Sequence, residues 1–173
     1  QVHKLDINIG KDFVQEPVFN ADFENSLNAS AHDGSPIEPL KQTNMSFVNG
    51  PVGKAIQLDD DKTNIEYNAK KLFSTDGAIL FWAAQNHDGS NYALPPDWTL
   101  HSFLNAIGDD GKTKLNFWFT WHWLRGEVGR KNNQSSVACQ RLGRSFIKKD
   151  DWNHYAMTWN NEGKIQLLLN GLP

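Results

Sequence analysis

The sequence predicts an all-β fold, an antiparallel sandwich of two sheets, from three observations. Short stretches that alternate apolar and polar residues recur along the chain, separated by clusters of Gly, Asn, Asp and Pro. That rhythm is typical of β-sandwiches. No apolar pattern of helical period extends beyond two turns, and no internal repeat divides the 173 residues. A chain of this length is enough for one domain with a sizeable core.

The first half of the chain contains short strand candidates between polar loops. Residues 1–16 are polar and mixed, and we expect an N-terminal extension or an edge strand there, around Leu5–Ile9. The expected sandwich covers residues 17–173. Its first strand candidates are β-prone or alternating and lie at residues 17–23, 44–48, 54–58 and 64–67.

The second half contains longer and more apolar strand candidates. Residues 78–84 are apolar on both faces, which predicts a strand covered on both sides, or covered on one side with a ligand on the other. Two hairpins and an edge strand are expected at residues 98–106 with 114–123, 151–159 with 164–169, and 137–141. Residues 86–97 and 125–136 are polar and expected to be loops, and we expect core positions for Trp82, Trp152 and Trp159.

The segment 152–171 carries the most specific motif of the chain. It reads Trp-x-His-x-x-x-Thr-Trp, a Gly-containing turn, and an aliphatic strand that ends in Asn-Gly. Gly-Lys-Ala-Ile-Gln-Leu-Asp at 53–59 and Asp-Gly-Ala-Ile-Leu-Phe-Trp at 76–82 precede it in order. Together these motifs resemble laminin-G-like domains of the concanavalin A-like lectin/glucanase superfamily, over roughly residues 18–171. The resemblance implies an antiparallel jelly-roll sandwich in an extracytoplasmic protein (secreted, periplasmic or on the cell surface), and says far less about function.

The end of the chain departs from that family pattern. Domains of this type usually continue past the Asn-Gly strand for one or two more strands, whereas this sequence ends at Pro173. We therefore expect a fragment of a larger protein that lacks its C-terminal closing strand, unless the segment around Leu5–Ile9 fills the gap. A sandwich without that strand would have an open edge, which is a hazard for unwanted pairing.

Charge and hydropathy exclude several classes of partner. The formal net charge is −3 and the basic residues are scattered, which argues against nucleic acid and anionic membrane surfaces. No apolar run reaches the roughly 18–20 residues that a membrane-spanning helix needs, so we expect no membrane insertion. Cys139 is the single cysteine, so no internal disulfide is expected.

Catalytic patterns of the superfamily are missing from the sequence. Its retaining glucanases share a Glu-x-Asp-x-x-Glu or Glu-x-Asp-x-Glu strand, which brings two carboxylates close enough for a nucleophile and an acid. No such run, Ser nucleophile elbow, phosphate-binding loop or Cys/His cluster occurs here. We therefore expect no catalytic residue in this segment, and a glycan-active enzyme stays open as the parent protein.

The aromatic residues point to carbohydrate binding. Seven Trp and ten Phe are present, and indole faces stack well on sugar rings, although large β-cores also use Trp. On the 114–123 strand, we expect the core face to carry Leu115, Phe117, Phe119, Trp121 and Trp123. The opposite face and its borders supply the candidate carbohydrate-binding residues, which are Asn116, Trp118, His122, His101, Arg125 and the loop residue Trp98. The alternative for Trp118 is packing beneath the 86–97 loop.

A calcium site is the other candidate. Asp59, Asp60 and Asp61 offer the hard oxygen ligands that Ca²⁺ prefers, and many laminin-G-like domains hold a structural calcium ion near turns. The alternative is a solvated acidic turn. No other cofactor is expected.

Three functions remain open from sequence. The first is a non-catalytic carbohydrate-binding or adhesion-type module of a secreted or cell-surface protein, with a glycan or polysaccharide as partner. The second is a structural accessory domain that packs against a neighbouring domain of a larger polysaccharide-degrading enzyme. The third is glycoside hydrolase or lyase activity within this segment.

Overall fold

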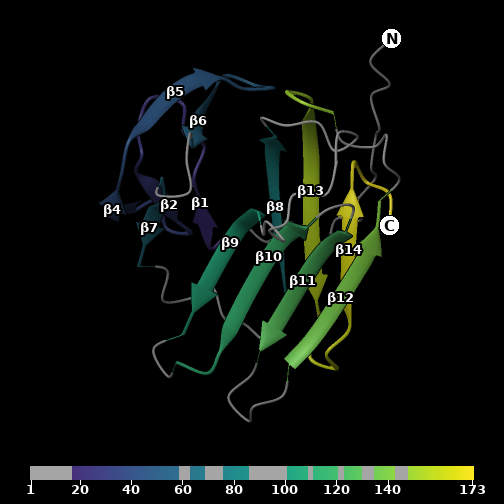
Figure 1. Cartoon of the computed structure of the whole chain (residues 1–173). Coiled ribbons are helices and arrows are strands. Elements are labelled where there is room, and N and C mark those ends of the chain that lie inside the picture. The colour runs from purple at the N-terminus through teal and green to yellow at the C-terminus, as the bar shows by residue number, and fades with distance from the viewer. Residues whose placement is uncertain are drawn as a thin grey trace. The chain divides into compact units, whose positions relative to one another are not determined.

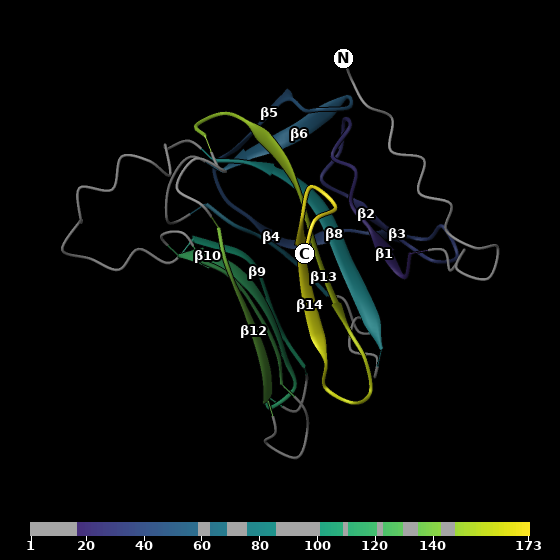
Figure 2. The same cartoon turned by 90° about the vertical axis from the view of Figure 1, so that its right-hand side faces the viewer.

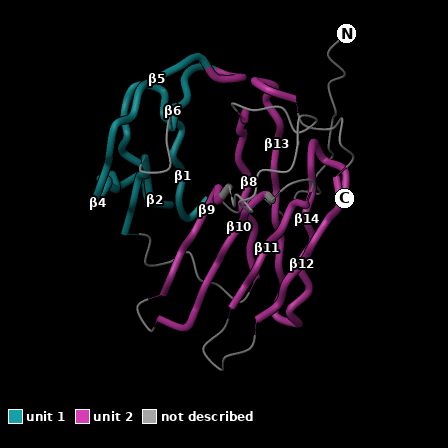
Figure 3. The backbone as a smooth tube through the Cα atoms, viewed as in Figure 1, with its two compact units in different colours: residues 1–49, 53–72 teal, residues 50–52, 73–173 magenta. Residues whose placement is uncertain are grey.

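The protein is described by a computed structural model, which covers residues 17–58, 63–68, 76–85, 101–108, 111–120, 123–129, 135–142 and 148–173. These described segments form fourteen strands and no helix (Figure 1), so the predicted all-β class is confirmed. The chain divides into two compact units, residues 1–49 with 53–72 and residues 50–52 with 73–173 (Figure 3). The expected extension at residues 1–16 lies outside the described residues.

Unit 1 consists of short antiparallel strands. They are β1 (Phe19–Asn20), β2 (Ala29–Ala31), β3 (Pro36–Ile37), β4 (Pro39–Gln42), β5 (Met45–Asn49), β6 (Lys54–Leu58) and β7 (Ile65–Tyr67). The sheets are β1-β2-β3, β4-β7 and β5-β6. Gly53, just before β6, has a φ of 67°, and a Cβ there would collide with the carboxylate of Glu24, which accepts the N–H of Lys54 at 3.2 Å. Glycine is favoured at this position, because it adopts the left-handed region without strain and leaves room for the Glu24 carboxylate.

Unit 2 contains the sandwich. One sheet has the order β14-β13-β8 and the other has the order β12-β11-β10-β9. Figure 2 shows the two sheets facing each other. Their strands are β8 (Gly77–Ala84), β9 (His101–Ile107), β10 (Lys114–Thr120), β11 (Trp123–Gly129), β12 (Ser135–Arg141), β13 (Trp152–Trp159) and β14 (Ile165–Leu169).

The core lies between these two sheets because every second residue of each strand points inward. Fully buried side chains from both sheets meet there, namely Leu115, Phe117, Phe119, Leu124, Tyr155 and Met157. Phe81 of β8 stacks on Tyr155 with ring centroids 5.5 Å apart, and it meets Phe117 edge-on at 5.3 Å. Burial of each such side chain contributes roughly 1.5–3 kcal/mol to the stability of the unit.

Gly126 lies where a side chain would collide with residues of the opposite sheet. A Cβ at this position would overlap the sulfur of Met157 and lie 2.9 Å from Cδ2 of Leu167. Met157 and Leu167 are buried residues of the opposite sheet. The absence of a side chain at Gly126 therefore lets β11 approach β13 and β14.

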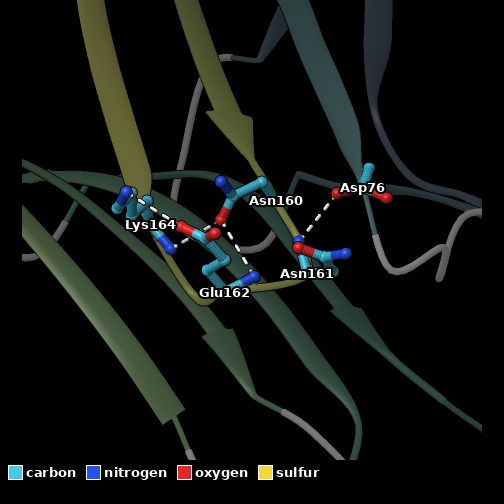
Figure 4. Close-up of polar contacts among 5 residues, drawn as sticks. All are labelled: Asp76, Asn160, Asn161, Glu162 and Lys164. Atoms are coloured by element: carbon cyan, nitrogen blue, oxygen red, sulfur yellow. Dashed lines mark hydrogen bonds and ion pairs between the residues drawn. The ribbon is translucent and has the colours of Figure 1, made fainter.

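The β13–β14 hairpin matches its prediction from sequence. Tyr155 pairs with Leu169 and Trp159 with Ile165, and Gly163 takes the positive φ of the turn at 83°. Figure 4 shows how the turn is held. Asn160 Oδ1 accepts the N–H groups of Glu162 at 3.1 Å and Lys164 at 3.0 Å, and Asp76 Oδ1 accepts the Asn161 N–H at 2.7 Å. Backbone donors that the turn would leave unpaired are thus satisfied by side chains.

One strand prediction was wrong. The stretch 114–123 is not a single strand, because β10 ends at Thr120 and β11 begins at Trp123. Residues 125–129, predicted to be a loop, continue β11 and pair with both β10 and β12. The inner face of β11 carries Leu124, Gly126 and Val128, and the glycine at its centre weakens the apolar alternation that identifies a strand. Strand β12 was correctly expected at the edge of this sheet.

Candidate functional site

The outer face of the β9–β12 sheet, defined as the face opposite the core, gathers aromatic and polar side chains. Cross-strand pairing places Trp118 opposite Arg125 and Asn116 opposite Glu127. It also places Trp123 opposite Arg141. Residues paired in this way share one face of a sheet, so the register brings side chains from three strands together.

Specific contacts organise this outer face. The guanidinium carbon of Arg141 lies 6.0 Å from the ring centroid of Trp123, within the range of a cation–π interaction. Asn116 Nδ2 donates to Glu127 Oε2 at 3.0 Å. Arg125 Nε and Asn116 Oδ1 are buried and have no hydrogen-bond partner within the described residues. Such orphaned groups cost free energy, and a ligand or ordered water commonly satisfies them.

The chemistry of the outer face suits recognition of a polar, ring-shaped ligand. The flat indoles of Trp118 and Trp123 can stack on apolar ring faces. The guanidinium groups of Arg125 and Arg141 offer forked donors for carboxylate or sulfate oxygens. Among the described residues of this face, Glu127 is one carboxylate against two guanidinium groups, so it balances only part of their positive charge.

The structure brings together some of the predicted site residues. Asn116 and Trp118 lie on the outer face, as the period-2 pattern predicted, and Arg125, expected only at its border, lies opposite Trp118 on β11. His122 and Trp98 lie outside the described residues. Strand β9 places Ser102 opposite Trp118 and His101 opposite Phe119, and the side chain of His101 is also outside the description.

The predicted calcium ligands are not described either. Asp59, Asp60 and Asp61 fall between β6 and the start of the next described segment. Within the segments that the structure does describe, no three His, Cys, Asp or Glu side chains gather into a group that could hold a metal ion. The calcium site therefore stays a prediction.

Three residues of the outer face were missed from sequence. Trp123 was assigned to the core and Glu127 to a loop, while Arg141 was considered only as part of an edge strand. The errors for Trp123 and Glu127 followed from the misplaced end of β10, whereas the place of Arg141 depends on the register of β12 against β11. The signal was present in the alternation of Trp123, Arg125 and Glu127 with Leu124, Gly126 and Val128, which gives β11 one polar and aromatic face and one inner face.

A second exposed aromatic surface lies on β8. Leu80 is 63% exposed and Trp82 is 51% exposed, so the predicted core position of Trp82 is wrong. Ile79 and Phe81 are the β8 residues that pack on the core, and the alternation turns Trp82 to the other side. Among the three tryptophans expected in the core, Trp159 is buried and Trp152 is partly buried.

His154 lies beside Trp82 on this second surface. The two rings have centroids 5.2 Å apart and are tilted by 58°. Partial burial lowers the pKa of His154, because desolvation disfavours the imidazolium form. Its backbone N–H is held by Asn170 Oδ1 at 2.9 Å. A neutral imidazole beside an exposed indole makes this surface mainly apolar.

Comparison with known proteins supports the fold. No protein-family model and no curated protein sequence matches the chain. Among solved structures, the chain is similar to the receptor binding domain of botulinum neurotoxin D, with a TM-score of 0.61 and 14% identity over 90% of this chain and 37% of that chain. It is also similar to a mutant of HCR/D, with a TM-score of 0.59 and 12% identity over the same shares.

These similarities extend to the architecture alone. The chain spans only 37% of the length of the structures it matches. At such low identity the likeness supports a β-rich sandwich, whereas the finer assignment to laminin-G-like domains stays a prediction. In the described part of the chain, no helix has the length and apolar character needed to cross a membrane.

Proposed function

We propose that the chain is a non-catalytic carbohydrate-binding module of a secreted or cell-surface protein. The observation that carries this proposal is the placement of Trp118 and Trp123 beside Arg125 and Arg141 on one sheet face. Indoles stack on the apolar faces of sugar rings, and guanidinium groups donate to their oxygens. The similarity to a structure named as the receptor binding domain of botulinum neurotoxin D supports a binding role.

The charge of the outer face favours an acidic saccharide. Two arginines face one carboxylate there, and Asn116 already bonds that carboxylate at 3.0 Å. Arg125 Nε and Asn116 Oδ1 lack partners within the described residues. The Arg125 side chain is only partly buried, so rotation about its torsions would present Nε to a ligand. A sugar bearing a carboxylate or sulfate would pair with the guanidinium groups while its ring stacks on Trp118.

A glycan array probed with the intact chain and with Trp118→Ala tests this function. We expect the wild-type chain to bind a subset of acidic glycans and Trp118→Ala to bind them at least tenfold more weakly, which corresponds to about 1.4 kcal/mol. Leu172→Ala is a matched control, because Leu172 is exposed and lies beyond β14. A folded wild-type chain that binds no glycan, or a Trp118→Ala variant that binds as well as wild type, would contradict the proposal.

The exposed surface of β8 favours a second candidate function. Leu80 and Trp82 together present apolar area to solvent, and such patches often mark contacts with another domain or protein. The chain would then be an accessory domain that packs against a neighbouring domain of a polysaccharide-degrading enzyme. In that case Trp82→Ala would weaken docking of the neighbouring domain, and Trp118→Ala would change no measured property. Hydrolysis or elimination of a glycan by the isolated chain would instead establish a catalytic function.

A further inference from the structure

Unit 1 contains a cleft of about 400 Å³, and none of the carbohydrate-binding or calcium-binding residues predicted from the sequence lines it. The loop at 25–28, the β4 region and one residue of β5 form its walls. The lining side chains that carry its chemistry are Asn25, Ser26, Asn28, Glu38, Gln42 and Phe47. They come from segments that are separate in sequence, so folding of unit 1 creates the cleft.

Hydrogen bonds hold the walls of this cleft in place. The hydroxyl of Tyr67, on β7, donates to the carbonyl oxygen of Leu27 at 2.5 Å. Burial raises the pKa of Tyr67 to about 12, so the hydroxyl keeps the proton that it donates. Ser26 Oγ accepts the N–H of Asn28 at 2.9 Å. Strand β7 also pairs with β4, so β7 supports both the 25–28 loop and the β4 wall. A site whose walls are already fixed loses less conformational entropy when a ligand binds.

The lining groups of the cleft match the chemistry of a sugar. Asn25, Asn28 and Gln42 are exposed, and within the described residues no hydrogen bond engages their side-chain amides. Each amide offers two donors and one acceptor, which suits hydroxyl groups that both donate and accept. Phe47 is 45% exposed and supplies the flat apolar surface on which a sugar ring stacks.

The charge of the cleft disfavours an anionic ligand. Glu38 is the one ionisable side chain that lines it among the described residues. A lone carboxylate repels carboxylate, sulfate and phosphate groups, whereas it accepts hydrogen bonds from hydroxyls. We propose that this cleft is a second saccharide site that binds neutral sugars, distinct from the arginine-bearing outer face of unit 2. The proposal extends the carbohydrate-binding function to unit 1, and either site can fail without the other.

Saturation-transfer NMR on the intact chain tests the cleft. Galactose and N-acetylglucosamine serve as neutral probes, and glucuronic acid serves as the acidic probe. We expect a neutral probe to bind, and Phe47→Ala and Gln42→Leu each to weaken that binding at least tenfold. Leu40→Ala is the matched control, because Leu40 is 69% exposed on the same strand as Gln42 and does not line the cleft.

The outcomes separate the two sites. Binding of a neutral probe that survives Trp118→Ala and Leu40→Ala but is lost in Phe47→Ala and Gln42→Leu supports the cleft. Circular dichroism of each variant verifies folding, and because Gln42 is exposed, Gln42→Leu decides the matter if Phe47→Ala unfolds. The proposal is overturned if no neutral probe binds, if Gln42→Leu binds normally, or if binding disappears with EDTA, which would assign it to a metal ion. Loss of binding only in Trp118→Ala would overturn the cleft and support the outer face.

Discussion

Replacement of Gly126 by alanine probes the packing of the two sheets of unit 2. The new methyl group would overlap the sulfur of Met157 and lie 2.9 Å from Cδ2 of Leu167. Both neighbours are buried in the core, so they can yield only by disturbing other side chains. Overpacking of this kind costs about 1–3 kcal/mol. For a chain of this length, that corresponds to a fall in melting temperature of roughly 2–12 °C.

Urea denaturation followed by circular dichroism measures this cost. Gly129→Ala, on the same strand, is the matched control, because a Cβ there would approach no heavy atom closer than 3.3 Å. The double variant Gly126→Ala with Met157→Ala removes the overlapping sulfur. It should therefore be more stable than the sum of the two single changes predicts, by about 1 kcal/mol. A Gly126→Ala variant as stable as Gly129→Ala, or strict additivity in the double variant, would refute the described approach of the sheets.

Four further predictions concern individual side chains and the predicted calcium ligands. Tyr155→Phe should leave stability unchanged or raise it by about 1 kcal/mol in urea denaturation, because the buried hydroxyl has no partner within the described residues; a large loss would reveal a missing partner. Asn160→Ala should lower the free energy of unfolding by about 1–2 kcal/mol, because it removes the acceptor of two turn N–H groups. The control Glu162→Ala removes an exposed ion pair with Lys164 and should lower the free energy of unfolding by under about 1 kcal/mol. The folded pKa of His154 lies below its ordinary value of 6.5, so the contribution of His154 to stability is complete above pH 6.5 and declines as the pH falls below 6.5. The stability of wild type relative to His154→Gln should therefore decrease on acidification. A stability difference that does not change with pH would contradict this. If Asp59, Asp60 and Asp61 hold calcium, EDTA should lower the melting temperature of wild type and leave a triple Asn variant unaffected.

The strands of unit 2 were predictable where alternation and turn chemistry agreed. In the β13–β14 hairpin, Tyr155, Met157 and Trp159 alternate with His154, Ala156 and Thr158, and Gly163 marks the turn. The end of β10 gave no such signal, because the sequence from Trp121 to Trp123 contains neither Gly, Asn, Asp nor Pro. Its position determines which residues of β11 face outward, so one missed turn moved Trp123 to the wrong face.

The candidate sites differ in how much of each could be predicted from the sequence. Asn116 and Trp118 follow from alternation along one strand. The approach of Arg141 to Trp123 depends on the register of β12 against β11, which the period of a strand does not specify. The cleft in unit 1 could not be predicted from the sequence, because loop residues such as Asn28 meet Gln42 and Phe47 only through tertiary packing.

The proposal that the outer face of the β9–β12 sheet binds a glycan is tested most directly by mapping the bound ligand. A ¹⁵N-labelled chain is titrated with an acidic glycan selected on the array, and the chemical shifts of its backbone and indole N–H groups are followed. The proposed function predicts that the largest shift changes cluster at Trp118, Trp123 and Arg125, with few changes around Trp82. Shift changes that avoid the outer face and gather elsewhere, or none at saturating glycan, would contradict it.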